Sequence, residues 1–152
     1  VGIGKEVMTH PVELLPGIRE AVEAVARELP VVLVTKGDLF HQEAKVAASG
    51  LSDLFKRIEI VSEKDARAYQ RVLAEFGVAP TGFAMVGNSL RSDIEPVVRL
   101  GGWGVHMPYE VTWAHELENG LEPAHRARIA SVDAPAGIPR AVAGLRAKAA
   151  MA

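Results

Sequence analysis

The feature that most constrains the fold of this chain is a regular alternation of short apolar runs with helix-like segments. Residues 31–34 form a β-branched apolar run of buried-strand length, and further strands are predicted over 57–61, 82–87 and 103–106, with a weaker one near 128–132. Helical patterns cover residues 16–29, 39–49, 65–76, 93–100 and 138–148, and a loop with a helical turn is expected over 109–118. Strands that alternate with crossover helices of about 12 residues form βαβ units with parallel strands. The sequence therefore predicts an α/β fold of three layers, a doubly wound and mostly parallel sheet with helices on both faces.

The composition removes several classes of partner and chemistry. The chain has 152 residues, which suffice for one domain with a core, and 17 Lys+Arg against 19 Asp+Glu give a net charge of −2. This balance lacks the basic footprint of a nucleic-acid-binding protein. The absence of cysteine excludes a thiolate metal site and a cysteine nucleophile, and fits a reducing compartment. No apolar stretch approaches the roughly 18 residues of a membrane span, so we expect a cytoplasmic protein without nucleic-acid or membrane partners.

Polar residues follow the predicted strands at the points where ligands bind in sheets of this kind, outside the carboxyl ends. Thr35 offers a hydroxyl and a backbone N–H at a turn, which suits a phosphate oxygen. Lys64 offers a positive charge at the same edge. Asn88 and Asp93 lie on a loop that begins with glycine, and their oxygens are ligands of the kind that Mg²⁺ accepts. The pattern predicts a site for an anion and a divalent metal.

Each of these residues also has a plain structural interpretation. Thr35 alone is typical of a turn, Lys64 alone of a solvated helix start, and Asp93 alone of a helix N-cap. Only their coincidence at one edge of the predicted sheet favours the functional interpretation.

The order of these segments resembles motifs two, three and four of the haloacid dehalogenase (HAD) superfamily. The resemblance rests on Leu33-Val34-Thr35, on Lys64 before a helix, and on residues 86–94, and it covers about residues 10–118. It implies a HAD-like, Rossmann-like core and a hydrolase, specifically a Mg²⁺-dependent phosphatase acting on a small phosphorylated metabolite. Dehalogenase chemistry is less expected, because the acidic metal loop is retained.

The resemblance also implies roles for individual residues. Thr35 would bind the phosphate, and Lys64 would stabilise the nucleophile and the phosphoryl charge, so both are candidate catalytic and substrate-binding residues. Lys36 and Gly37, on the same turn as Thr35, are further substrate-binding candidates.

Asn88 and Asp93 would hold Mg²⁺ in this scheme. Position 88 is commonly Asp in the family, and a carboxamide contributes no charge, so weaker metal affinity is expected here.

One element of the family is missing from the sequence. The family's nucleophile is the first Asp of an Asp-x-Asp motif on its first strand, upstream of the cap domain, and no such motif occurs in this chain. The reaction passes through an aspartyl-phosphate, so this chain alone is predicted to be inactive and to be the C-terminal part of a longer hydrolase. We expect a single HAD-like core domain over residues 1–152. In it, residues 1–13 would be a lead-in from the cap region, 14–118 the core, and 119–152 a final strand and helix.

The missing first strand would lie at the centre of the sheet, between the strands that end at Thr35 and Gly87. Its removal would leave two rows of unpaired backbone groups facing each other. We expect the gap to be closed by direct pairing, to be filled by another segment, or to be filled by a partner chain, as in a homo-oligomer or strand-swapped dimer.

One other functional interpretation remains open, and two candidate motifs are rejected because the spacing of their residues does not fit. A non-catalytic phosphate-binding, anion-binding or assembly module is the main alternative, and a receiver-like domain would need an acidic cluster and an upstream Asp that are not visible. Residues 2–5 lack the spacing of a phosphate-binding loop. His106, His115 and His125 are separated by nine and ten residues, which is not a helical metal-ligand pattern.

Overall fold

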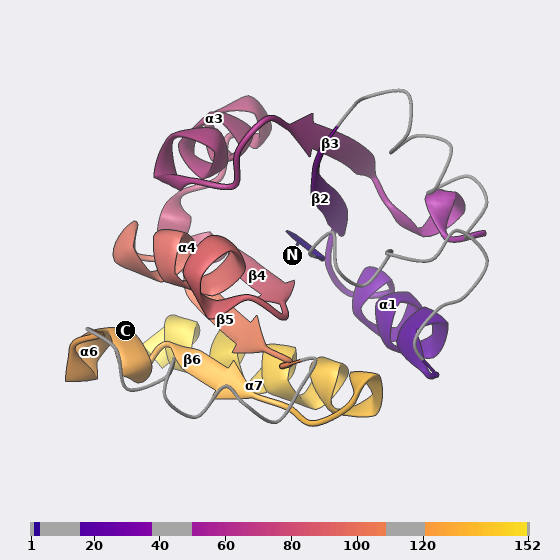
Figure 1. The fold of residues 1–152 in the computed structure, drawn as a ribbon. Coiled ribbons are helices and arrows are strands. Elements are labelled where there is room, and N and C mark those ends of the chain that lie inside the picture. The colour runs from indigo at the N-terminus through magenta and orange to yellow at the C-terminus, as the bar shows by residue number, and fades with distance from the viewer. Residues whose placement is uncertain (1, 4–15, 38–49, 109–120, 152) are drawn as a thin grey trace.

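The computed structural model describes residues 2–3, 16–37, 50–108 and 121–151 (Figure 1). The helix expected over 39–49 and the loop expected over 109–118 lie outside these residues. The described strands are β1 (Gly2–Ile3), β2 (Val32–Lys36), β3 (Arg57–Val61), β4 (Ala84–Gly87), β5 (Trp103–His106) and β6 (Ile129–Ser131). They form one sheet in the order β3-β2-β1-β4-β5-β6, and all of its pairings are parallel. The predicted parallel α/β sheet is therefore confirmed.

Helices cover both faces of this sheet, as predicted. They are α1 (Ile18–Ala26), α3 (Ala66–Phe76), α4 (Glu95–Arg99), α6 (Pro123–Arg126) and α7 (Ile138–Met151). Helices α1 and α7 pack on one face against a core that includes Leu33 and Val86, whereas α3 and α4 pack on the other against Val34 and Met85 (Figure 1). Successive strand residues point to opposite faces, which is why neighbouring apolar residues serve separate cores. Within the described part of the chain, no helix combines the length and the apolar character that crossing a membrane requires.

The centre of the sheet is filled by β1. Gly2 and Ile3 pair with Val32 and Leu33 on one side and with Met85 and Val86 on the other. Of the three ways in which the central gap could be closed, the structure thus shows the second, in which another segment of the chain fills it. In the resulting order, the sequence of the strands along the sheet reverses between β1 and β4, and α/β sheets bind ligands at such a point.

Local sequence signals fix both ends of α3. Asp65 is its N-cap, and the carboxylate accepts a hydrogen bond of 2.9 Å from the backbone N–H of Ala68. Gly77 ends the helix in the left-handed conformation, with φ of 64°, directly after residue 76, where the helical pattern predicted the end. Because Lys64 directly precedes the cap, this start of α3 determines where the lysine side chain leaves the backbone.

The segment after β4 differs from the expected helix over 93–100. A π-helical turn (Leu90–Ile94) comes first, and α4 follows it. The interpretation of Asp93 as an N-cap is wrong, because the cap is Ser89, whose hydroxyl accepts a hydrogen bond of 3.2 Å from the N–H of Ser92. Asp93 instead lies inside the turn and is buried, so its carboxylate is available for contacts with other elements.

Candidate functional site

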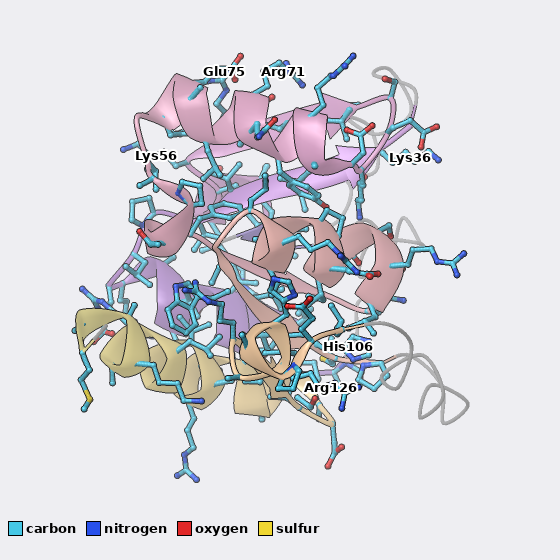
Figure 2. The ribbon with its side chains drawn as sticks, turned by 90° about the vertical axis from the view of Figure 1, so that its left-hand side faces the viewer. Lys36, Lys56, Arg71, Glu75, His106 and Arg126 are labelled. Atoms are coloured by element: carbon cyan, nitrogen blue, oxygen red, sulfur yellow. The ribbon has the colours of Figure 1, made fainter. Side chains whose placement is uncertain are left out.

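Buried polar side chains are concentrated at the carboxyl edge of the sheet. Five polar or charged side chains are buried among the described residues, and four of them lie at or just beyond the carboxyl ends of strands: Thr35, Lys64, Asp93 and His106. In Figure 2, Lys36 marks the carboxyl edge of the sheet, at the end of β2. Lys56, just before β3, lies on the opposite side. Thr35, Lys64 and Asp93, which the sequence predicted at one edge of the sheet, therefore all lie at that edge.

Lys64 and Asp93 form a buried ion pair at this edge. The distance from Lys64 Nζ to Asp93 Oδ1 is 2.7 Å, and the two side chains are 2% and 0% exposed. Asp93 Oδ2 accepts a second hydrogen bond, of 3.1 Å, from the backbone N–H of Ser89. The interpretation of Lys64 as a solvated residue is wrong, because its side chain is buried against a partner that lies 29 positions away in the chain. Removing two charges from water is costly, and the pair persists because both carboxylate oxygens are satisfied.

Gly87 is required by the same carboxylate. A Cβ atom at this position would lie 2.4 Å from Asp93 Oδ2 and 2.5 Å from its Cβ and Cγ. The glycine that leads the loop therefore makes space for Asp93 to fold back beneath the end of β4.

Two residues that were not predicted as site residues contact the loop after β4 from neighbouring elements. The Tyr69 hydroxyl, from α3, donates to the carbonyl of Ser92 at 2.9 Å. His106 Nε2, from the end of β5, is 3.0 Å from the carbonyl of Asn88. Tyr69 lies in the helix predicted over 65–76 but had no predicted role, and the spacing of His106 argued against a metal ligand. The signal that could have identified Tyr69 is its hydroxyl, because a tyrosine hydroxyl needs a polar partner when it is buried in the core.

Thr35 and Lys36, expected on a turn, are the last two residues of β2, and the segment from Thr35 to Gly37 divides between the interior and the surface. Thr35 is buried, whereas Lys36 is 44% exposed and its Nζ lies 3.0 Å from Glu63 Oε2. Gly37 has φ of 143°, and its N–H donates to the carbonyl of Val61 at 3.2 Å. The structure thus brings Thr35 and Lys64 to one buried edge and directs Lys36 into a surface ion pair beside it.

The residues expected to hold a metal supply part of a site. Asn88 Oδ1 is buried and has no hydrogen-bond partner among the described residues, so this oxygen can bind a ligand. Asp93 supplies a carboxylate, but Lys64 neutralises its charge. The described residues contain no group of three or more His, Asp or Glu side chains that could hold a metal ion. Asn88 and Asp93 therefore fit Mg²⁺ as two oxygen donors of an incomplete site.

A family profile for haloacid dehalogenase-like hydrolases matches residues 3–101. The chain belongs to the haloacid dehalogenase-like hydrolases. This confirms the resemblance, and Thr35, Lys64, Asn88 and Asp93 all lie in the part of the chain that the family shares.

Relatives of known structure or sequence agree with this HAD-like assignment. A haloacid dehalogenase-like family hydrolase from Xanthomonas campestris is 51% identical, with a TM-score of 0.82 over 95% of this chain and 60% of that chain. An uncharacterised protein from Listeria monocytogenes serotype 4b shares the fold at 18% identity, with a TM-score of 0.79 over 96% of this chain and 98% of that one. A phosphoserine phosphatase from Thermus thermophilus is 31% identical over 106 residues, which are 66% of this chain and 39% of that protein. The chain thus spans 60% of the first and 39% of the third of these proteins, less than two thirds of each.

Proposed function

We propose that this chain forms the phosphate-binding part of a HAD-like phosphatase that acts on a small phosphorylated metabolite. The observation that carries the proposal is the buried Lys64–Asp93 pair at the carboxyl edge, where Thr35 is buried as well. A desolvated ammonium at this edge is worth much more to a phosphoryl group than one in water, because little solvent screens it. The similarity to a phosphoserine phosphatase supports phosphate ester hydrolysis over other reactions of the family.

In this proposal the chain's own residues bind and stabilise the phosphoryl group. Thr35 donates a hydrogen bond to a phosphate oxygen, and Lys64 stabilises the charge that develops during transfer. Lys36 and Gly37 border the same position and complete the substrate-binding turn. Bound Mg²⁺, held by Asn88 and Asp93, would neutralise negative charge on the phosphate. Because Asn88 is uncharged, this site should bind Mg²⁺ more weakly than one with two carboxylates.

The nucleophile is not among these residues. No Asp-x-Asp occurs in the 152 residues, so we expect the chain alone to lack turnover and a form that carries an upstream Asp-x-Asp segment of its gene to have it. Turnover of para-nitrophenyl phosphate with Mg²⁺ tests both statements. Robust Mg²⁺-dependent turnover by the 152-residue chain would contradict this account of the nucleophile.

A matched pair of lysine variants tests the role of Lys64 in the longer form. Lys64→Met should lower kcat about 10²-fold, the usual effect of losing one group that stabilises transition-state charge. Lys56→Met is the control, because Lys56 lies exposed at the opposite edge of the sheet (Figure 2). Equal activity of the two variants would remove Lys64 from the proposed site.

The alternative function, phosphate or anion binding without turnover, is favoured by the lack of Asp-x-Asp in the sequence. Calorimetry with inorganic phosphate distinguishes the two functions. Binding by the longer form that Lys64→Met abolishes, together with no hydrolysis of phosphate esters, would support the binding module.

Three further properties belong to the same proposal. We propose that residues 1–152 form one domain, that the cysteine-free chain works in the cytoplasm, and that copies can exchange β1 in a strand-swapped dimer. The exchange is supported by the short pairing of β1, which contributes Gly2–Ile3 between two longer strands. Gel filtration combined with amide exchange in β2 and β4 tests it, and a monomer at all concentrations would contradict it.

A further inference from the structure

The π-helical turn that carries Asp93 is attached to α3 at two adjacent positions. Lys64, just before the helix, pairs with Asp93 at 2.7 Å, and Tyr69, in the first turn of the helix, donates its hydroxyl to the carbonyl of Ser92 at 2.9 Å. Two contacts between the same two elements fix their relative rotation as well as their distance.

The two contacts differ in stiffness. The lysine side chain is a flexible stem with four carbons, and it can follow its partner through small displacements. The tyrosine side chain has two χ angles, and Tyr69 is buried in the core formed by residues such as Val61, Leu73 and Val97. The phenol ring therefore sets the position of Ser92, and the lysine adapts to it.

The sequence explains why the Ser92 carbonyl needs a donor from another element. In a continuous α-helix this carbonyl would accept from the backbone N–H of residue 96, four positions later. Residue 96 is Pro96, which has no N–H. The Tyr69 hydroxyl supplies a donor in its place, and the turn takes the wider π-helical form, which is rare and frequent at functional sites.

We propose that Tyr69 is a positioning residue that holds the π-helical turn, and with it Asp93, in register with Lys64. Tyr69 acts through Ser92 and contacts no reacting atom. This inference rests on the proposed function in one respect, since it assigns the consequence of the contact to phosphoryl transfer. Its structural part, the restraint of the turn by one hydroxyl, stands independently.

The first test uses Tyr69→Phe, which removes only the hydroxyl, in the longer form of the protein with para-nitrophenyl phosphate as the substrate. We expect kcat to fall about tenfold, the size that the loss of one hydrogen bond allows, and KM to stay within about twofold. The control is Trp103→Phe, which removes another hydrogen bond of 2.9 Å, from Trp103 Nε1 to the carbonyl of Thr81, at the amino edge of the sheet. An equal loss of kcat in the control, or an effect confined to KM, would overturn the proposal.

The second test does not depend on activity. Amide exchange in the 152-residue chain, followed by NMR, should accelerate about tenfold at Ser92 and Asp93 in Tyr69→Phe and stay unchanged there in Trp103→Phe. Unchanged exchange at the turn in Tyr69→Phe would overturn the restraint itself. If the longer form hydrolyses no phosphate ester, the proposed function fails, while this measurement still decides whether Tyr69 holds the turn.

A rescue variant completes the design. Pro96→Ala returns a backbone N–H that can donate to the Ser92 carbonyl, so Tyr69→Phe should change exchange at the turn by less than about threefold in that background. The same acceleration with and without Pro96 would show that the missing N–H is not what Tyr69 replaces, and it would overturn this part of the proposal.

Discussion

The two edges of the sheet are built from the same strands but hold different kinds of side chain. At the carboxyl edge, Thr35, Lys64, Asp93 and His106 are all buried and polar or charged. At the amino edge, two pockets of about 190 and 210 Å³ share Leu29, Gly82 and Phe83 and are lined mainly by apolar residues. Burying charge is expensive, and buried charges are concentrated at functional sites, so the difference supports the proposal that the carboxyl edge is the working edge.

The polar contacts of the amino edge have the character of ordinary structural contacts. The Arg128 guanidinium lies 4.7 Å from the centroid of the Trp103 ring and also donates to the carbonyl of Gly101. These contacts join the end of one loop to the start of β5 at a site that water reaches. A pocket of about 380 Å³ between α1 and α7, larger than the two at the amino edge, likewise lies away from the buried charges. Pocket size and buried charge therefore point to different parts of this protein.

The largest difference between the edges should appear when the buried pair is broken. Asp93→Asn keeps an acceptor for the Ser89 N–H but leaves the Lys64 ammonium buried without its counter-charge, so it should lower the free energy of unfolding by about 3–5 kcal/mol. Urea denaturation measures this value. The double variant Lys64→Met with Asp93→Asn should recover much of the loss, because it removes the unpaired charge. A loss below about 1 kcal/mol for Asp93→Asn would mean that water screens the pair.

The second largest loss of stability is expected at Gly87, whose backbone packs against the Asp93 carboxylate. Gly87→Ala would place a methyl group 2.4 Å from Asp93 Oδ2, and relief of this overlap should cost about 1–3 kcal/mol of stability. Gly144→Ala in α7 is the matched control, since its added Cβ would meet nothing within 4 Å beyond its chain neighbours and the backbone of its own helix, and it should stabilise the helix by about 0.5–1 kcal/mol. Thermal unfolding of both variants makes the comparison. Similar losses at both positions would refute the close approach at Gly87.

The parts of the fold that the sequence predicted are those with strong local patterns. The apolar run at 31–34 predicted β2, and the helical pattern over 65–76 predicted α3, because both signals depend on neighbours in the chain. The π-helical turn was not predicted, since a 3.6-residue period does not distinguish it from an α-helix. Nor was the role of Gly2–Ile3 as the central strand, because two residues carry no periodicity.

The candidate site was predictable as a location and less so as a set of contacts. Parallel strands bring their carboxyl ends together, so the topology alone placed Thr35 and Lys64 at one edge. The burial of Lys64 could not be read from its neighbours, Glu63 and Asp65, because its partner lies 29 residues later. The contact of Tyr69 with Ser92 spans 23 residues and depends on the unpredicted turn.

At the amino edge, a smaller loss is expected from removing the guanidinium over Trp103. Arg128→Met keeps an apolar stem but loses the cation–π contact and the hydrogen bond to Gly101, and the expected cost is about 1 kcal/mol. Chemical denaturation gives the value, and phosphate ester turnover by the longer form should be unaffected. A loss as large as that of Asp93→Asn would erase the proposed contrast between the edges.

The smallest effect should come from an ion pair on the helix next to the site. Glu95 Oε1 lies 2.7 Å from Arg99 Nη2, as short as the Lys64–Asp93 contact, but these side chains are 23% and 50% exposed. Solvent screening reduces such a pair to about 0.3–0.5 kcal/mol, so Glu95→Gln should cost no more than that, and less in 1 M salt. Denaturation at low and high salt measures the difference. Since the two pairs share charge, distance and neighbourhood, a cost near that of Asp93→Asn would show that proximity rather than burial gives the Lys64–Asp93 pair its strength.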